Sequence, residues 1–153
     1  MRQHICVPHG LRAAAALCLT AFAIYASGNP STPVGRWRTV DDHTGKPRSI
    51  VSIYEQNGKL FGKVESSLDP ARAGRRCDRC KDDRKDKPVV GMVIIRNLVK
   101  NGDEYSGGDI LDPDNGTVYR CKIWLIEGGN KLAVRGYVGI SLFGRSQTWM
   151  REP

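Results

Sequence analysis

Only one long apolar run occurs in this sequence, and it lies at the very start. Ala13 to Ala26 is almost unbrokenly apolar, ends in small residues and follows a basic segment. This pattern is typical of a secretory signal peptide, here residues 1–28 with cleavage at about residues 23–28, and it is short for a membrane span. We therefore expect an exported bacterial protein, periplasmic or secreted, with no membrane-spanning helix in the remainder.

Histidine is scarce, and its scarcity excludes many catalytic and metal-binding arrangements. The chain has three histidines, and only His43 lies beyond the predicted signal peptide. A Ser-His-Asp or Cys-His device would have to use that residue, and a metal site with several histidines is excluded. No glycine-rich phosphate loop follows a strand and opens a helix, so a nucleotide cofactor has no support. We expect no enzymatic activity, no catalytic residue, no metal and no cofactor, and we interpret His43 as an exposed turn residue.

Basic residues outnumber acidic ones, 24 to 16, which gives a formal net charge of +8. Such an excess can indicate a nucleic-acid or anionic-membrane partner. Here, however, basic and acidic side chains alternate, as in residues 81–87, and this alternation is typical of a solvated loop. Because the export signal also argues against a nucleic-acid partner, we expect a monomer whose surface makes at most a weak contact with anionic lipid or lipopolysaccharide.

Turn signals divide the rest of the chain into short segments rich in Val, Ile, Leu and Tyr. Asn57-Gly58 and residues 100–103, 112–116 and 127–130 supply the tight reversals that hairpins need. The segments between them are too short to be typical helices and alternate in polarity. They predict eight strands, at residues 35–40, 49–56, 59–66, 89–99, 104–111, 117–126, 131–138 and 145–151.

An eight-stranded meander closes readily, because closure removes both exposed edges. The predicted fold is therefore all-β, an antiparallel up-and-down barrel with little or no helix. Residues 29–34 form an extended N-terminal segment, and residues 35–153 form a single domain. That domain carries a long charged Cys-x-x-Cys loop at residues 69–88. An interior of this size is either filled by side chains or holds one small ligand.

The cysteines outside the signal peptide are Cys77, Cys80 and Cys121. In an oxidising compartment a structural disulfide is the favoured interpretation, with Cys121 as an alternative partner for either cysteine of the loop. Thiol–disulfide exchange is second, because nearby arginines would stabilise a thiolate. Zinc is third, because one pair plus a distant cysteine makes an incomplete site.

The first and last predicted strands carry a lipocalin-like signature. Gly35-Arg36-Trp37 resembles the Gly-x-Trp motif of lipocalins, in which the tryptophan closes the barrel base against a late arginine; Arg145 or Arg151 would supply it here by a cation–π contact. Further segments extend the resemblance over nearly the whole domain, namely residues 58–63, the cysteine pair, and residues 88–91, 107–113 and 135–145. Together they resemble the exported bacterial domain-of-unknown-function family 2147. This resemblance implies a lipocalin-like calycin barrel that binds a small apolar molecule, and it implies no catalytic residue.

We therefore predict that the barrel interior binds a small hydrophobic or amphipathic ligand. The candidate lining residues are Tyr54, Met92, Ile94, Tyr105, Tyr137, Phe143 and Trp149, with Tyr137 and Phe143 nearest an open mouth. Two alternatives stay open. One is a thiol–disulfide redox protein that uses Cys77 and Cys80. The other is a ligand-free envelope interaction module that uses the 69–88 loop, and it predicts a barrel packed solid.

Overall fold

The computed structural model describes residues 31–41 and 43–153. The predicted signal peptide at residues 1–28, and the first two residues of the predicted extended segment, lie outside the described residues. Within the described part of the chain, no helix has both the length and the apolar character needed to cross a membrane.

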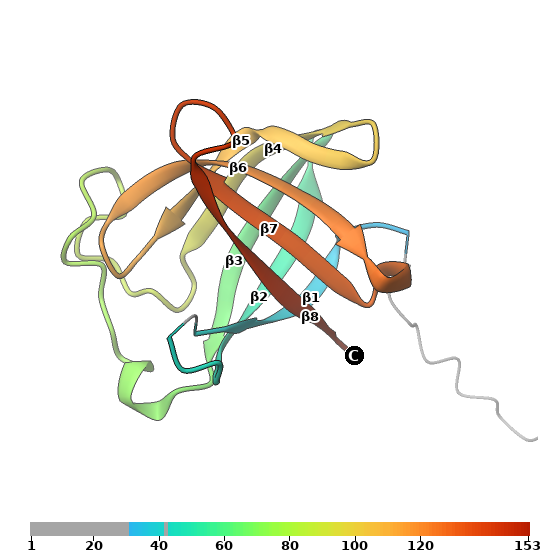
Figure 1. Ribbon diagram of the computed structural model, residues 1–153. Helices are drawn as coiled ribbons and strands as arrows, with labels where there is room; N and C mark the ends of the chain where they lie inside the picture. The colour runs from blue at the N-terminus through green and yellow to red at the C-terminus, as the bar shows by residue number, and fades with distance from the viewer. Residues whose placement is uncertain (1–30, 42) are drawn as a thin grey trace, which may run out of the picture.

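Eight antiparallel strands form a closed barrel in which each strand pairs with its sequence neighbours, and the last pairs with the first (Figure 1). The predicted eight-stranded all-β barrel is therefore confirmed. Two short 3-10 helices, η1 (Pro70–Arg72) and η2 (Glu127–Gly129), are the helical elements among the described residues. The strands are β1 (Gly35–Val40), β2 (Pro47–Gln56), β3 (Lys59–Ser67), β4 (Val93–Asn101), β5 (Glu104–Asp112), β6 (Thr117–Ile126), β7 (Lys131–Tyr137) and β8 (Gly144–Glu152).

The turn residues adopt the backbone conformations for which their chemistry suits them. Asn57 and Gly58, between β2 and β3, have φ angles of 52° and 72°, the pair of positive values that a two-residue hairpin turn requires. Gly102 and Gly116 occupy positive φ in the β4–β5 and β5–β6 turns. Local turn chemistry therefore sets the hairpins, and the period-two apolar pattern then directs one face of each strand inward.

Two predicted segments differ from the structure. The fourth strand begins at Val93, not at residue 89, because Gly91 turns the chain at φ 91° and the Met92 amide donates to the Val89 carbonyl. Residues 31–34 are not extended: they form a turn and a bend. Pro33 in this segment is buried, and its carbonyl accepts a hydrogen bond of 2.7 Å from the Trp37 indole. Both segments pack on the barrel.

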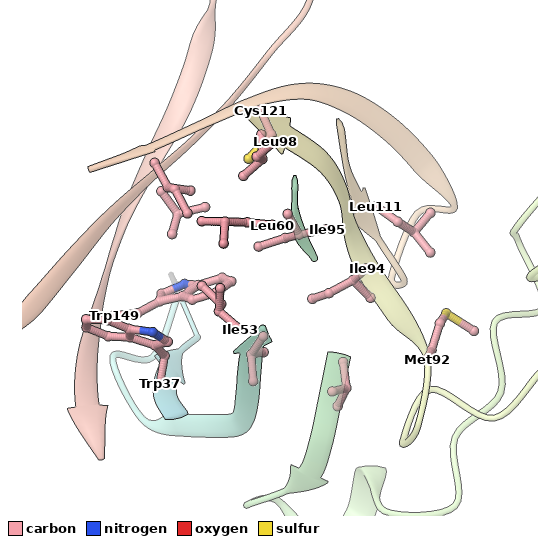
Figure 2. Packing of buried hydrophobic residues seen from close by; sticks show 14 of the residues in the cluster. Trp37, Ile53, Leu60, Met92, Ile94, Ile95, Leu98, Leu111, Cys121 and Trp149 are labelled. Atoms are coloured by element: carbon pink, nitrogen blue, oxygen red, sulfur yellow. The ribbon is translucent and has the colours of Figure 1, made fainter. Parts of the chain in front are cut away.

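The base half of the barrel is filled by side chains. Figure 2 shows Trp37, Ile53, Leu60, Ile95 and Leu98 within this core. All five are at most 1% exposed. The β2–β3, β4–β5 and β6–β7 connections lie at this base end, and the other four connections lie at the opposite end.

Candidate ligand-binding cavity

A cavity of about 680 Å³ opens at the end of the barrel opposite the base, and this end is called the mouth below. Its lining comes from all four connections at that end and from the strands that lead into them. Ligand pockets in proteins typically measure roughly 300–1,000 Å³. The interior is thus packed at the base and hollow toward the mouth, which leaves room for one small molecule.

The inner wall of the cavity is mainly apolar. Val64, Ile94, Leu111, Val134 and Trp149 all line it and come from five different strands. Each of these side chains is at most 7% exposed to solvent. A ligand that reaches them exchanges water for apolar contact on several sides, which is favourable by roughly 25 cal/mol per Å² of apolar surface buried.

A few polar groups lie among these apolar residues. The Thr39 and Ser49 hydroxyls bond to each other at 2.8 Å, and the Trp149 indole donates to the Gln147 amide oxygen at 2.9 Å. All four residues line the cavity. Each of these polar groups already has a hydrogen-bond partner within the protein, so an apolar ligand would leave none of them unpaired.

The base of the barrel is closed by Trp37 and an arginine, as the Gly-x-Trp resemblance implies. The guanidinium of Arg151 lies 4.2 Å from the Trp37 ring centroid. It also donates to three backbone carbonyls: Gly129 at 2.7 Å, Thr32 at 2.8 Å and Val34 at 3.2 Å. Burial lowers the pKa of Arg151. The guanidinium therefore ties the N-terminal segment and the β6–β7 connection to the last strand.

Gly35 and Arg145, the other two predicted base residues, lie at opposite ends of the barrel. Gly35 lies beneath the arginine, since a Cβ atom there would stand 2.9 Å from Arg151 Nη1. Arg145 does not lie at the base; it lines the cavity near the opposite end of β8. The prediction that either Arg145 or Arg151 could serve is thus resolved in favour of Arg151, because β8 pairs Arg151 directly with Trp37.

Four of the seven predicted ligand residues line the cavity: Ile94, Tyr137, Phe143 and Trp149. Tyr54, Met92 and Tyr105 are not among the residues that line it. Tyr54 points away from the interior because its neighbour Ile53 is buried there, and its ring stacks on Phe61 at 5.8 Å. Met92 is buried in the core cluster, and Tyr105 packs against that cluster near the base end of β5.

The mouth carries a group of arginines that the sequence analysis missed. Arg48 on β2 and Arg72 and Arg75 in the β3–β4 connection all form ion pairs with Asp114; the Arg72 Nη1–Asp114 Oδ1 distance is 3.0 Å. Burial and the neighbouring Arg72 and Arg48 charges lower the pKa of Arg75. Arg79 also lines the cavity. Within the described residues its side chain has no recorded hydrogen bond or ion pair.

A clue to this group was visible in the charged loop. Its first half, residues 71–79, contains four arginines and one acid, whereas its second half alternates in sign. The alternation in residues 81–87 indicated a solvated loop, and no periodicity assigns a face to residues 71–79.

The Cys77–Cys80 disulfide is present, with 5.4 Å between the Cα atoms. Both cysteines are buried, at 0% and 2% exposure. Cys121 is a free, buried thiol, so the alternative in which it bridges to the loop is wrong. Burial is the main cause that raises the pKa of Cys121 well above its ordinary value, with a smaller effect from the charge of Asp109. It is therefore an inert core residue.

The loop that carries the disulfide packs tightly on the β5–β6 turn. A Cβ atom at Gly116 would lie 2.0 Å from the Arg79 carbonyl oxygen. The Arg75 guanidinium donates to the Pro113 carbonyl at 3.3 Å. The same contact between loop and turn therefore places Arg75 and Arg79 at the cavity mouth.

His43 lies in the exposed β1–β2 connection and contributes to the cavity rim. Its backbone amide donates to the Asp41 carboxylate at 3.1 Å. Over the described ranges, no group of three His, Cys, Asp or Glu side chains is arranged to hold a metal ion.

The β7–β8 connection exposes an apolar surface beside the mouth. Val138, Ile140, Leu142 and Phe143 are 59–79% exposed. Arg135 braces this loop by donating to the Ser141 carbonyl at 2.7 Å and the Leu142 carbonyl at 3.2 Å. An exposed apolar group of this kind is uncommon on a protein that contacts only water.

Comparisons with known proteins agree with this geometry. Residues 35–151 match the family described as "Uncharacterized protein conserved in bacteria (DUF2147)". The barrel is similar to protein HP1028 from Helicobacter pylori, which is described as belonging to the lipocalin family, with a TM-score of 0.68 at 22% identity. The similarity covers 78% of this chain and 82% of that protein, and it concerns the fold. No curated protein matches the chain. The chain belongs to the DUF2147 family of bacterial proteins, with a lipocalin-like barrel.

Proposed function

We propose that this protein binds one small hydrophobic or amphipathic molecule inside the barrel and performs no catalysis. The observation that supports this most directly is the cavity of about 680 Å³ with its apolar inner wall. Binding would be driven by apolar burial in a largely preformed space, with few polar groups to fix orientation.

A matched pair of substitutions tests this proposal. Val134 lines the cavity, whereas Val118 is 45% exposed on β6 and does not. Val134→Phe should fill part of the hollow and weaken binding of the neutral dye N-phenyl-1-naphthylamine about tenfold or more, which corresponds to about two lost methylene contacts. Val118→Phe adds the same atoms outside the barrel and should leave dye binding unchanged. Equal binding by both variants, or no dye binding by the wild type, would contradict the proposal.

The two alternative functions have less support. A redox role needs accessible sulfur, whereas both disulfide cysteines are at most 2% exposed. A ligand-free interaction module predicts a solid barrel, and the cavity argues against it.

We also propose that the protein acts in the bacterial periplasm or outside the cell, and that it contacts anionic lipid. The basic and then apolar start of the sequence supports export. The exposed β7–β8 loop supports the lipid contact, because apolar side chains beside Arg135 and Arg145 suit the interface of an anionic membrane.

Vesicle sedimentation tests the lipid contact. The double variant Ile140→Ser with Leu142→Ser should bind phosphatidylcholine–phosphatidylglycerol vesicles about tenfold more weakly than the wild type, since it removes two exposed apolar side chains. Neither residue lines the cavity. The matched control, Val99→Ser with Val118→Ser, changes two exposed strand valines and should bind like the wild type. Equal loss in both variants would refute this contact.

A further inference from the structure

We infer that the ligand carries an anionic head group, and that Arg48, Arg72, Arg75 and Arg79 at the cavity mouth bind it while its apolar part lies in the cavity. These four residues are called the mouth arginines below. This inference rests on the proposed function and deepens it, because it specifies a single-chain amphipathic anion as the ligand class.

The mouth arginines lie at the open end of the cavity. All four line the cavity, and three of them come from the β3–β4 connection, drawn in green in Figure 1. Apolar side chains of the same cavity lie further inside, with Val64 and Trp149 among them. The cavity therefore presents cationic groups outside and apolar groups within, which is the pattern that an amphipathic anion would match.

The charges at the mouth do not cancel. Asp114 accepts from Arg48, Arg72 and Arg75 at once. Arg48 also has Asp41 at 3.5 Å, and Arg72 has Asp69 at 3.7 Å. Arg79 has no such partner within the described residues. Five arginines and three aspartates line the cavity, so positive charge is in excess there. A guanidinium offers a planar fork of donors that suits a carboxylate or phosphate, so a second anion could bind beside Asp114 or take over some of its partners.

The mouth also has a recess for the head group. A shallow depression, open to solvent, lies next to the cavity and is lined by Arg72, Arg75, Arg76, Arg79, Asp78 and Asp114. Four of these six residues are arginines, and three of the four also line the main cavity. A head group at this boundary would stay partly hydrated while the chain attached to it is buried.

The frame of this site is built in advance. The Cys77–Cys80 disulfide closes the segment between Arg76 and Lys81, and the Cys77 amide and carbonyl bond across the loop to Lys87 and Asp86. The contact at Gly116 fixes the backbone of Arg79 against the β5–β6 turn. Ordering the loop beforehand reduces the entropy that binding would otherwise lose.

Two probes with the same chain and different heads test the inference. Decanoate and 1-decanol are each used to displace N-phenyl-1-naphthylamine from the protein near neutral pH. Decanoate should bind about tenfold more tightly than decanol, as expected when a charged group gains hydrogen bonds at a partly exposed site. Raising the salt from about 0.1 M to about 1 M should remove most of this difference by screening.

Arg79→Gln removes one mouth arginine without breaking a recorded ion pair, so the fold should be kept. It should weaken decanoate binding about three- to tenfold and change decanol binding less than about twofold. The control is Arg120→Gln, an exposed arginine on β6 outside the cavity. It makes the same change in net charge and should leave both probes unaffected.

The outcomes separate the inference from the proposed function. If decanol and decanoate bind equally and Arg79→Gln changes neither, the inference is overturned while ligand binding stands. If neither probe displaces the dye and the dye itself does not bind, the proposed function fails as well. If inorganic phosphate alone binds as tightly as decanoate, the mouth is a site for free anions and the amphipathic ligand class is wrong.

Discussion

Replacing Gly116 by alanine should destabilise the protein much more than the same change at Gly58, although both glycines have nearly the same backbone conformation. Their φ angles are 71° and 72°, so each alanine carries a similar left-handed strain of roughly 1–2 kcal/mol. A Cβ atom at Gly58 would meet nothing within 4 Å, whereas one at Gly116 would lie 2.0 Å from the Arg79 oxygen. The comparison therefore isolates the packing of the disulfide loop on the β5–β6 turn.

The size of the difference follows from that overlap. Backbone at residues 79 and 80 must move by more than an ångström to admit the methyl group, and overpacking of this kind typically costs about 1–3 kcal/mol. We expect Gly116→Ala to lose about 2–5 kcal/mol in total and Gly58→Ala about 1–2 kcal/mol. Urea unfolding followed by tryptophan fluorescence measures both, provided that the m values agree. Equal losses would refute the tight loop–turn contact, and with it the preformed frame of the arginine site.

Three further predictions concern the base, the acid response and the free thiol. Arg151→Lys should lower the free energy of unfolding by about 2–4 kcal/mol, because lysine cannot donate to three carbonyls and contact the ring at once. The control, Arg145→Lys, should change it by less than about 0.5 kcal/mol. Equal effects of both variants in urea unfolding would refute the role of Arg151 at the barrel base. Hydrogen bonds from Arg84 lower the pKa of Asp82 to about 2. The stabilisation of the fold by the Asp82 carboxylate is therefore present above its unfolded pKa of 3.8 and is lost as the pH falls toward about 2. Asp82→Asn should reduce the loss of stability in this acid range, and an unchanged profile of stability against pH would argue against the Asp82–Arg84 pair. Cys121 should resist iodoacetamide in the folded protein and react fully in urea, as read by mass spectrometry, and rapid labelling of the folded state would contradict its burial.

The strands were predictable because their signals are local. Asn57-Gly58 and the alternation around Leu60 depend only on turn chemistry and the period of the pleat. The apolar residues 89–92 were predicted to begin the fourth strand, but they form a bent segment whose side chains pack on the core. A continuous apolar run cannot by itself distinguish a strand from a bent segment that packs on the core.

The choice between Arg145 and Arg151 could not be made from the sequence. The two residues have the same parity along β8, so the period-two pattern places both on one face. Only their distance along the strand separates them, and that depends on the register with which β8 meets β1, Trp37 opposite Arg151. Register between the first and last strands is set by closure of the whole barrel.

The site was the least predictable part for a related reason. Tyr54 and Tyr105 were predicted from the chemistry of their side chains. Whether a side chain points into the barrel depends on strand register, and whether it reaches the cavity depends on which end of the barrel is filled. The mouth arginines lie in a loop without periodicity. Their position follows from contacts with Asp114 and Gly116, which are more than 30 residues away in the sequence.

Native mass spectrometry of the protein purified from its own host, without denaturant or detergent, would show whether the barrel holds a small molecule. We expect a bound species with one added small molecule, which is lost on unfolding and is depleted in Val134→Phe but retained in Val118→Phe. Organic extraction of the same preparation should recover that molecule, and by the further inference it should be an amphipathic anion. Repeated preparations at the bare mass of the chain, together with no uptake of N-phenyl-1-naphthylamine, would contradict the claim that this barrel is a container.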